Sequence, residues 1–573
     1  MNRNTCNLFI DHDDVEEYLI EYRGNLLEQM KNINYACVFE VTSKLALLAV
    51  KGDRLEELRK NVPAIIFVNF RNMYVLEGTS VEDVSNINPI KINKYLNLTG
   101  RGVIIGIVDT GIDYTNREFL REDNTSRIEV IWDQTINLPN SNQNPDEVFT
   151  GTIFDNTKIN EAIKAKLSGN DPYAIVPSKD EIGHGTQMAS IAGARGYDED
   201  VEGVANDCTF AIVKLKESKK FKKQLEDENI RNIPVYYLCS IIAGIEYLKN
   251  YALKVKKPMI ILNSIGTSEH SHDSSDIFSR YLNRIASYRG LVFVAGCGNE
   301  GLAEGHASGY ITGIGDVKEV ELQVGESMKF LQFKVYVRRP NKMAIAVIAP
   351  SSESSEFMSS NLYKEKVIEY VLENTTLKID FYNVDNFTGL QTFVLSFSNI
   401  KAGIWKIRLK GEYIVNGRFD IWMFSRKMLK GETSLTSPCT CGTITNPSTS
   451  RYSLTISNYN QNNITVYSKS GLATTSIEGF EIDVAAGGVD VKCIFLNNQR
   501  VYITGTSVSA AVATGAALLL FQWGIVEGND PYMYSQTLKS YMLRGTYRRK
   551  NDIYPNIEWG YGILDLLGVF TNL

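Results

Sequence analysis

Four short apolar runs constrain the possible folds of this chain more than any other feature. They lack the alternating polar residues of a half-exposed strand, and they lie at 103–109 (VIIGIVD), 210–215 (FAIVKL), 259–263 (MIILN) and 291–296 (LVFVAG). Strands with both faces buried are typical of parallel sheets covered by helices. The segments 241–251 and 277–288 between them have helical spacing. We therefore expect an α/β core that begins near residue 101.

The N-terminal 78 residues predict a separate small α+β unit. Apolar stretches at 7–10, 37–41, 45–50 and 64–75 alternate with helical patterns at 15–27 and 53–61. Strand, helix, strand, strand, helix, strand is the order of a split βαβ arrangement.

The pattern changes again between 311 and 437, where apolar and polar residues alternate with a period of two. The clearest such segments are 320–324, 330–337, 377–384, 392–397, 404–409 and 419–424. They predict an antiparallel β-sandwich or jelly roll. The α/β pattern returns from 438 and closes with an Ala-rich helix from Ser507 onward. We therefore expect four units, 1–78, 79–310, 311–437 and 438–573, the third inserted into the α/β domain.

Charge and hydropathy argue against two kinds of partner. The 573 residues carry a formal net charge of −6, whereas nucleic-acid binding needs a clustered basic surface. The longest apolar stretch, 510–523, is shorter than the roughly 20 residues of a membrane helix and contains Thr514 and Gly515. We expect neither a nucleic-acid partner nor a membrane span. The first twenty residues include Asp and Glu where a signal peptide is apolar, which predicts a protein made inside the cell.

Three residues supply what amide hydrolysis by serine needs, namely a hydroxyl, a base and a carboxylate that orients the base. Asp109 ends the predicted strand 103–109, and catalytic groups gather at that end of a parallel sheet. His184 lies in GHGTQMASIAG and Ser507 in GTSVSAAVATGAALLLF, each where a helix is predicted to begin. Each residue alone also has a structural explanation, because Asp is common in turns and Ser caps helices.

The chain has five histidines, so the choice of base is narrow. His12 lies in an acidic N-terminal turn, and His270, His272 and His306 lie in polar, loop-like stretches. We expect these four side chains to be solvated, which leaves His184 as the candidate base.

Asn299 follows the predicted strand 291–296 in the segment GCGNEG. Its side-chain amide is a candidate donor to the oxyanion of acyl transfer. The same letters satisfy G-x-G-x-x-G, the dinucleotide fingerprint, but the Gly-rich GLAEGHASGY that follows does not predict the required helix. The oxyanion interpretation is therefore favoured.

Together these segments resemble the subtilase family. The matches are V-D-T-G at 108–111, H-G-T-x-x-A at 184–189, N-S-I-G at 263–266, A-G-x-G-N-E-G at 295–301 and G-T-S at 505–507, in the family's order. The resemblance covers roughly 79–310 and 438–573. It implies a subtilisin-like parallel sheet with helices on both faces, and an N-terminal unit that acts as a propeptide.

The resemblance also implies roles for single residues. Asp109 would orient His184, His184 would be base and then acid, Ser507 would be the nucleophile, and Asn299 would stabilise the oxyanion. The strand that pairs with the substrate backbone would be formed by Ser264, Ile265 and Gly266. Two residues depart from the usual family pattern: Ala511 replaces a proline and Gln187 a frequent histidine.

Within the family, the propeptide and the β insertion are similar to those of the Csp germination proteases of spore-forming clostridia. That likeness implies a protease stored in the spore, whose substrate is the precursor of a cortex-lytic hydrolase and whose own cleaved propeptide can stay bound as a partner. We expect Ser507 to cut the propeptide once in the region of Glu77, Gly78, Thr79 and Ser80.

Two other functions remain open at this point. A silent subtilase fold that acts as a germination sensor or scaffold would typically have lost a triad member, and none is lost here. A general intracellular subtilase would degrade proteins broadly.

No cofactor is expected. Subtilases often bind calcium, but the sequence contains no carboxylate-rich loop with ligand spacing, and Asp198, Glu199 and Asp200 form only a weak candidate. Cys439 and Cys441 are close enough for a metal or redox pair, although no second pair lies at zinc spacing. Two ordinary loop thiols are the simpler interpretation of that pair.

Overall fold

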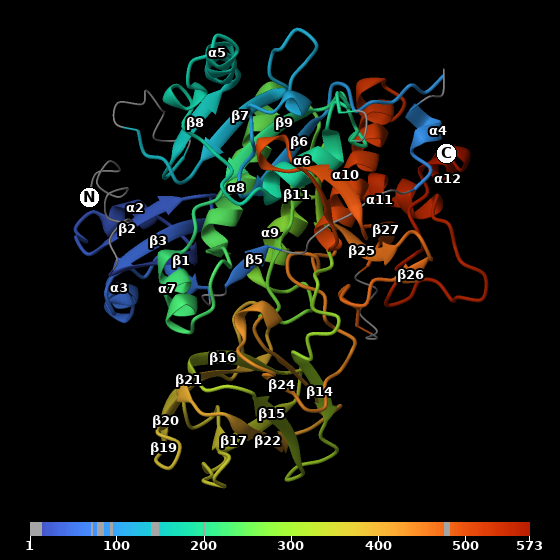
Figure 1. Cartoon of the computed structure of the whole chain (residues 1–573). Coiled ribbons are helices and arrows are strands. Elements are labelled where there is room, and N and C mark those ends of the chain that lie inside the picture. The colour runs from blue at the N-terminus through green and yellow to red at the C-terminus, as the bar shows by residue number, and fades with distance from the viewer. Residues whose placement is uncertain are drawn as a thin grey trace.

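The structure, a computed structural model, describes residues 14–69, 73–76, 85–91, 95–138, 148–198, 201–474 and 482–573. A mainly parallel sheet forms the centre of the larger body (Figure 1). Its strands in spatial order are β26 (Thr465–Val466), β25 (Leu454–Asn460), β13 (Leu291–Gly296), β11 (Met259–Asn263), β6 (Ile104–Asp109), β9 (Thr209–Lys214), β7 (Ile128–Asp133) and β8 (Thr152–Asp155), with β27 (Val484–Gly487) also beside β25. Only the two edge pairings, β7 with β8 and β25 with β26, are antiparallel.

Both faces of this sheet are buried, as the unbroken apolar runs predicted. Ile104 and Val108 of β6 pack on one side, and Ile105 and Ile107 pack on the other. The first side is covered by α8 (Leu238–Val255) and α9 (Ile277–Ile285). The second side is covered by α5 (Asn156–Leu167), α6 (His184–Gly193), α10 (Thr506–Phe521) and α11 (Ser535–Arg544).

Shorter elements complete the body: α4 (Asn88–Lys91), α7 (Lys219–Asp227), α12 (Leu566–Thr571) and the hairpin of β28 (Val491–Ile494) with β29 (Arg500–Ile503).

The N-terminal unit is a four-stranded antiparallel sheet with two helices. Along the chain it consists of β1 (Val15–Tyr22), α2 (Leu26–Met30), β2 (Ala36–Glu40), β3 (Leu45–Lys51), α3 (Leu55–Asn61) and β4 (Ile65–Val68), with spatial order β2-β3-β1-β4. The split βαβ arrangement is present, but the predicted helix over 15–27 is wrong. The i, i+4 spacing of Val15 and Leu19 suggested a helix, whereas pairing of β1 with β3 and β4 on both sides makes this segment a strand. The predicted strand at 7–10 lies outside the described residues.

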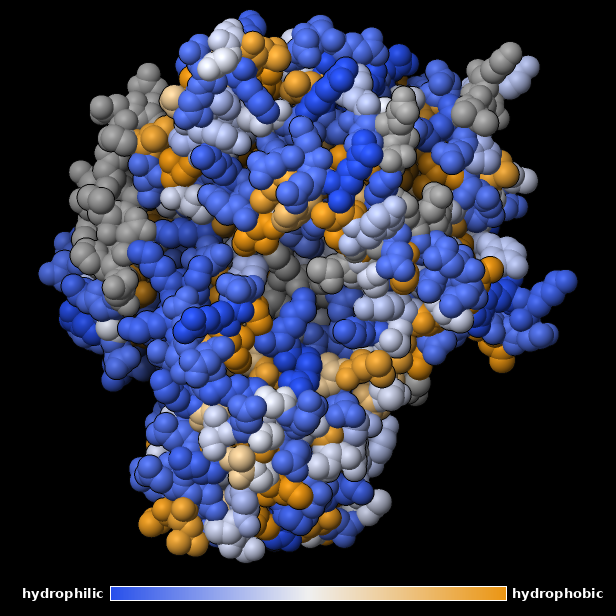
Figure 2. Space-filling model, viewed as in Figure 1, coloured by the Kyte–Doolittle hydropathy of each residue, from blue (hydrophilic) through white to orange (hydrophobic). Residues whose placement is uncertain are grey.

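The insertion consists of two antiparallel sheets that form the lower lobe in Figures 1 and 2. One contains β14 (His306–Tyr310), β23 (Arg418–Trp422), β16 (Met328–Val337), β21 (Gln391–Ile400), β20 (Thr375–Tyr382) and β19 (Glu365–Tyr370). The other contains β18 (Met358–Ser359), β17 (Lys342–Ile348), β22 (Gly403–Tyr413), β15 (Val317–Val324) and β24 (Ser434–Leu435). Phe397 and Trp405 meet between the sheets with ring centroids 5.3 Å apart, so the sheets face one another across an apolar core. The jelly-roll topology and the four unit boundaries stay predictions.

One helical segment of the described residues, Thr506–Val526, is long and apolar enough to cross a membrane. It extends beyond the apolar stretch 510–523 seen in the sequence. Because 89% of its most apolar window is buried inside the protein, it has the surroundings of a core helix.

Candidate active site

Asp109 and His184 are joined at the carboxyl end of β6. The Nδ1 atom of His184, the first residue of α6, lies 2.8 Å and 3.0 Å from the two carboxylate oxygens of Asp109. The same carboxylate accepts the N–H of Thr110 at 2.8 Å. A carboxylate can only accept here, so Nδ1 carries the proton and Nε2 is left with a free lone pair. His184 is thereby fixed in the tautomer that can take a proton.

The turn before α6 positions the imidazole of His184. Gly183 has φ of 88°, a left-handed conformation that glycine adopts without strain. Asp180 accepts the N–H of Gly183 at 2.7 Å with one oxygen, and the N–H and hydroxyl of Thr186 at 3.0 Å and 2.7 Å with the other. The first N–H groups of a helix have no carbonyl acceptor within the helix. The buried carboxylate of Asp180 accepts such N–H groups at the start of α6.

Gly185 fits against the loop that follows Asp109, and only glycine leaves enough room. A Cβ at Gly185 would lie 2.2 Å from the carbonyl oxygen of Gly111. We expect Gly185→Ala to cost about 1–3 kcal/mol in the free energy of unfolding, since backbone must move to relieve the clash, and to lower activity as the imidazole shifts. Gly305→Ala is the matched control, because its Cβ would meet nothing closer than 3.9 Å. Denaturant unfolding curves that shift equally for both variants would contradict this account.

Ser507 lies in the first turn of α10 and is completely buried. The helix begins directly beside the end of β13, since a Cβ at Gly296 would lie 2.5 Å from the carbonyl oxygen of Thr506. α10 packs against α6, which brings the two helix starts to the same edge of the sheet. Ala511, where the family usually has proline, lies inside the unbroken helix and leaves its course unchanged.

Several buried polar atoms at this edge have no hydrogen-bond partner among the described residues. They include Nε2 of His184, Oγ of Ser507 and Nδ2 of Asn299. Buried polar groups in folded proteins are nearly always paired, so each exception needs an explanation. The side-chain oxygen of Asn299 accepts the N–H of Thr506 at 3.3 Å, which leaves its amide group as a donor. A base, a hydroxyl and a donor are thus held in place without a partner.

A short sheet beside these residues holds a segment of the N-terminal region. β5 (Tyr74–Leu76) is the middle strand, between β10 (Val235–Tyr236) and β12 (Ile265–Gly266), and both pairings are antiparallel. In the register Leu76 faces Ile265 and Val75 faces Gly266. Ser264 directly precedes β12, and its hydroxyl is a further buried atom without a partner among the described residues. The predicted cleavage region, 77–80, follows β5 and lies outside the described residues.

β10 was not predicted from the sequence, although 235–238 is a short apolar run (VYYL) that could have been noticed. A two-residue strand has no periodicity to detect, and its partner lies 160 residues away in the chain.

The prediction of solvated histidines is wrong for three of the four. His270, His272 and His306 are 4%, 3% and 1% exposed. The ring of His272 stacks on Trp422 with centroids 4.0 Å apart, and His306 stacks on Trp422 at 4.6 Å. Residue-type patterns along the chain could not reveal this stack, because the insertion supplies the tryptophan. His12 lies outside the described residues.

The weak calcium candidate is only partly described. Asp198 pairs with Arg500 at 2.5 Å, which supplies a cation to its carboxylate, and Glu199 and Asp200 lie outside the described residues. Within the described ranges, no group of three or more His, Cys, Asp or Glu side chains is arranged to hold a metal ion.

Comparisons with known proteins identify the family and the fold. The model of the subtilase family matches residues 100–380 and 431–562. The structure of the CspB protease of Clostridium perfringens matches with a TM-score of 0.74 and 27% identity, over 85% of this chain and 97% of that one. Fervidolysin of Fervidobacterium pennivorans, a keratinolytic enzyme related to subtilisin, matches with a TM-score of 0.50 and 10% identity, over 98% of this chain and 61% of that one, which shows a likeness of fold alone. A search of curated proteins gives no match. The family match covers well over half of the sequence, so the chain belongs to the subtilase family, whose members are subtilisin-like serine proteases.

Proposed function

We propose that this subtilase is a serine endopeptidase whose catalytic triad is Asp109, His184 and Ser507. Nε2 of His184 takes the proton of the Ser507 hydroxyl as the serine oxygen attacks the scissile carbonyl. The resulting imidazolium is stabilised by Asp109 and then gives its proton to the leaving amine. The developing oxyanion accepts a hydrogen bond from the Asn299 amide, near the positive end of α10.

The observation that carries this proposal is the bond between His184 and Asp109, which leaves Nε2 buried and without a partner among the described residues. His270 and His272 are also buried with one ring nitrogen unpaired among the described residues, so what distinguishes His184 is its bond to a carboxylate at the carboxyl end of a parallel strand. A proton acceptor and a hydroxyl that are both left without a partner in the described part of the chain, at the carboxyl edge of the sheet, are available to act as base and nucleophile.

Asn299→Ala is expected to lower kcat by about 10²–10³-fold and to leave KM nearly unchanged, because the amide acts only on the charge that develops in the transition state. Steady-state kinetics on a peptide substrate measure this split. Asn458→Ala is a demanding control, since this buried amide accepts the Ser509 hydroxyl at 3.0 Å farther along α10. A rise in KM with unchanged kcat in Asn299→Ala would contradict the oxyanion role.

We also propose that the enzyme cuts its own chain once within 77–80, and that the N-terminal unit stays bound as an inhibitor. The position of β5 supports this, because an extended strand paired on both sides is how substrate peptides add to a sheet. Mass mapping of the new chain ends identifies the cut, and an intact chain in an active preparation would contradict self-processing.

The natural substrate that we propose is the precursor of a spore cortex-lytic hydrolase, cut by limited proteolysis during germination. The support is the likeness to the CspB protease over nearly its whole length. The enzyme would then be made inside the cell and stored in the spore.

Two measurements test these proposals separately. A fluorophosphonate probe should label purified protein at Ser507, and an unlabelled Ser507 in folded protein would favour a silent sensor. Incubation with the cortex-lytic precursor should give one cut, with little hydrolysis of casein. Broad casein hydrolysis would instead support a general degradative protease while leaving the triad intact.

A further inference from the structure

Two chain crossings connect the insertion with the catalytic body, and they run side by side. The outgoing crossing passes Glu304 and reaches His306 at the start of β14. The returning crossing passes Leu435 and Cys439. The N–H of Leu435 donates to the carbonyl of Glu304 at 3.0 Å, and the N–H of Cys439 donates to the carbonyl of His306 at 2.8 Å. We call 304–306 together with 435–442 the neck.

The neck carries two cysteines whose side chains face one another. Sγ of Cys439 lies 2.7 Å from Sγ of Cys441, and both residues are partly exposed. Four other cysteines, Cys208, Cys239, Cys297 and Cys493, are all buried. The neck therefore holds two neighbouring thiols that a small solute can reach.

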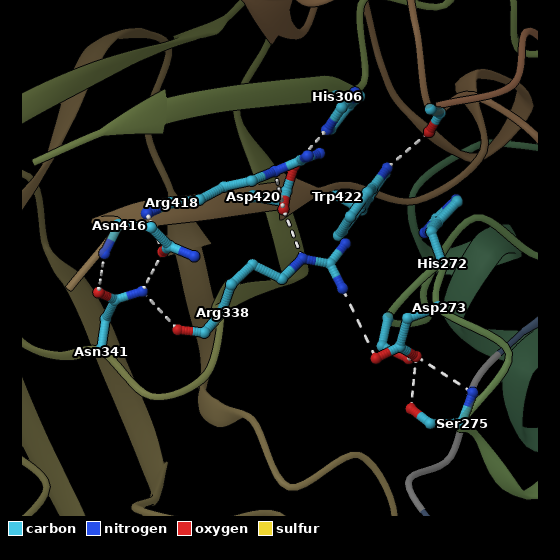
Figure 3. A network of polar contacts seen from close by, with 12 residues as sticks. His272, Asp273, Ser275, His306, Arg338, Asn341, Asn416, Arg418, Asp420 and Trp422 are labelled. Atoms are coloured by element: carbon cyan, nitrogen blue, oxygen red, sulfur yellow. Dashed lines mark hydrogen bonds and ion pairs between the residues drawn. The ribbon is translucent and has the colours of Figure 1, made fainter. Parts of the chain in front are cut away.

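His306 stands beside the pair as a charged ring. Its Nδ1 lies 2.6 Å from the carbonyl oxygen of Cys441, and its Nε2 lies 3.2 Å from Oδ1 of Asp420. Neither oxygen can donate, so both ring nitrogens carry hydrogen and the ring is an imidazolium. Burial, the largest single influence, opposes this charge, but the interactions with Asp420 and Cys439 together outweigh it and raise the pKa of His306. Figure 3 shows the ring directed at Asp420 and stacked near Trp422.

Positive charge exceeds negative charge around Asp420. The carboxylate meets Arg338 at 2.9 Å and Arg418 at 3.2 Å in addition to His306 (Figure 3). Asp273 lies 3.6 Å from Arg338 and offsets part of this charge. One further anion at Cys439 would balance the site, and an electropositive, partly exposed setting is where reactive thiolates occur.

The two thiols are therefore unequal. The thiol of Cys441 donates to the sulfur of Cys439, and the positive charge of His306 lies nearby; together they lower the pKa of Cys439. The pKa of Cys441 is raised, because its proton is held by that thiolate. Gly442, with φ of 69°, turns the chain so that its carbonyl accepts the indole N–H of Trp422 at 2.9 Å, which fixes the turn after the pair. Cys439 is therefore suited to attack a disulfide, and Cys441 is suited to displace the group that Cys439 has acquired.

We propose that Cys439 and Cys441 form a redox-active dithiol in the neck that reacts with the disulfides of low-molecular-weight thiols. The Cys439 thiolate attacks such a disulfide, R–S–S–R, forms a mixed disulfide and releases one R–S⁻. Cys441 then loses its proton to water and attacks Sγ of Cys439, which forms the Cys439–Cys441 bond and releases the second R–S⁻. The protein loses two electrons and the one proton of Cys441, and the small disulfide gains the two electrons and leaves as two R–S⁻. His306 acts as a positioning residue for the thiolate.

Peptide mapping of the full-length protein after incubation with oxidised glutathione tests the order of these steps. The wild-type peptide should lose two hydrogens by closing the Cys439–Cys441 bond. Cys441→Ser should accumulate one glutathionyl group on Cys439, because nothing resolves the mixed disulfide. Cys439→Ser should gain none on Cys441 in the same time. Equal glutathionylation of the two single variants, or a wild-type dithiol that never closes, would overturn the proposal.

The pH dependence of alkylation provides a second readout, which a merely structural role of His306 would not change. Below its pKa of about 8.5, an ordinary thiol reacts roughly tenfold more slowly for each unit by which the pH falls, because the thiolate is the nucleophile. Cys439 should instead react at a nearly constant rate from about pH 5 to 8. His306→Gln should shift the profile toward that of an ordinary thiol, with slower reaction at the acidic end. Should that variant fail to fold by its thermal melting curve, Arg418→Gln removes a neighbouring charge and should steepen the profile in part. A steep profile for wild-type Cys439 would contradict the assignment.

Discussion

Ser507→Ala is expected to abolish proteolysis, with kcat falling about 10⁶-fold, the loss that follows when the attacking oxygen is removed from a complete triad. The side chain is buried and its hydroxyl contacts no other polar atom of the described residues. Loss of the hydroxyl therefore removes no hydrogen bond of the fold. The variant should melt at nearly the same temperature as the wild type and should purify as a single uncut chain.

Ser509→Ala is the matched control for this variant. Ser509 lies two residues farther along α10 and is equally buried, but its hydroxyl donates to the side-chain oxygen of Asn458 at 3.0 Å. Its loss should lower stability by about 1 kcal/mol and leave self-cleavage intact. Electrophoresis and intact mass compare the two. A cut Ser507→Ala chain from a protease-free host would show that another agent processes the N-terminal unit.

Asp109→Asn is expected to lower kcat by about 10⁴-fold while preserving the fold. The carboxylate now accepts from Nδ1 of His184 with both oxygens near 3 Å. An asparagine amide facing that nitrogen would donate instead, so the ring would carry its proton on Nε2. An Nε2 that is already protonated cannot take the proton of Ser507.

Asp113→Asn separates this effect from a general change in charge. The Asp113 carboxylate lies four residues away and accepts only local donors, the N–H and hydroxyl of Thr115 at 3.2 Å and 2.8 Å. We expect its kcat to stay within about threefold of the wild type. Pre-steady-state acylation measures both variants, and wild-type acylation by Asp109→Asn would remove Asp109 from the triad.

The parallel core could be predicted because each of its strands carries its own evidence. β6, β9, β11 and β13 are unbroken apolar runs, a pattern that burial on both faces requires and that needs no knowledge of neighbours. β1 could not be predicted in this way. Its i, i+4 spacing favoured a helix, but the segment is a strand because it pairs with β3 on one side and β4 on the other. β17 (KMAIAVI) was missed because its buried run lacks the alternation that identified six other strands of the insertion. The strands β14, β18, β19 and β24 were missed as well.

Residues of the candidate site could be named because short motifs fix their local backbone. The sequence identified Asp109 and His184 together, and the structure joins them by hydrogen bonds, although the catalytic roles stay predictions. The histidine stack around Trp422 could not be anticipated, because it depends on contacts between units far apart in the chain. Burial of a polar residue by a distant unit leaves no mark in the sequence around it.

The N-terminal unit is held at more than one place. β5 is enclosed between β10 and β12, and Phe67 of β4 meets Phe387 of the insertion edge-to-face, with ring centroids 3.9 Å apart. Cleavage of one peptide bond after β5 would leave the contact between Phe67 and Phe387 in place. If β5 then dissociated, it would rebind at a high effective concentration, because the unit would still be attached through the insertion. The residence time of the cleaved N-terminal unit would thus depend on its contacts with the insertion as well as on β5. The insertion would therefore influence how soon the active site becomes accessible to substrate.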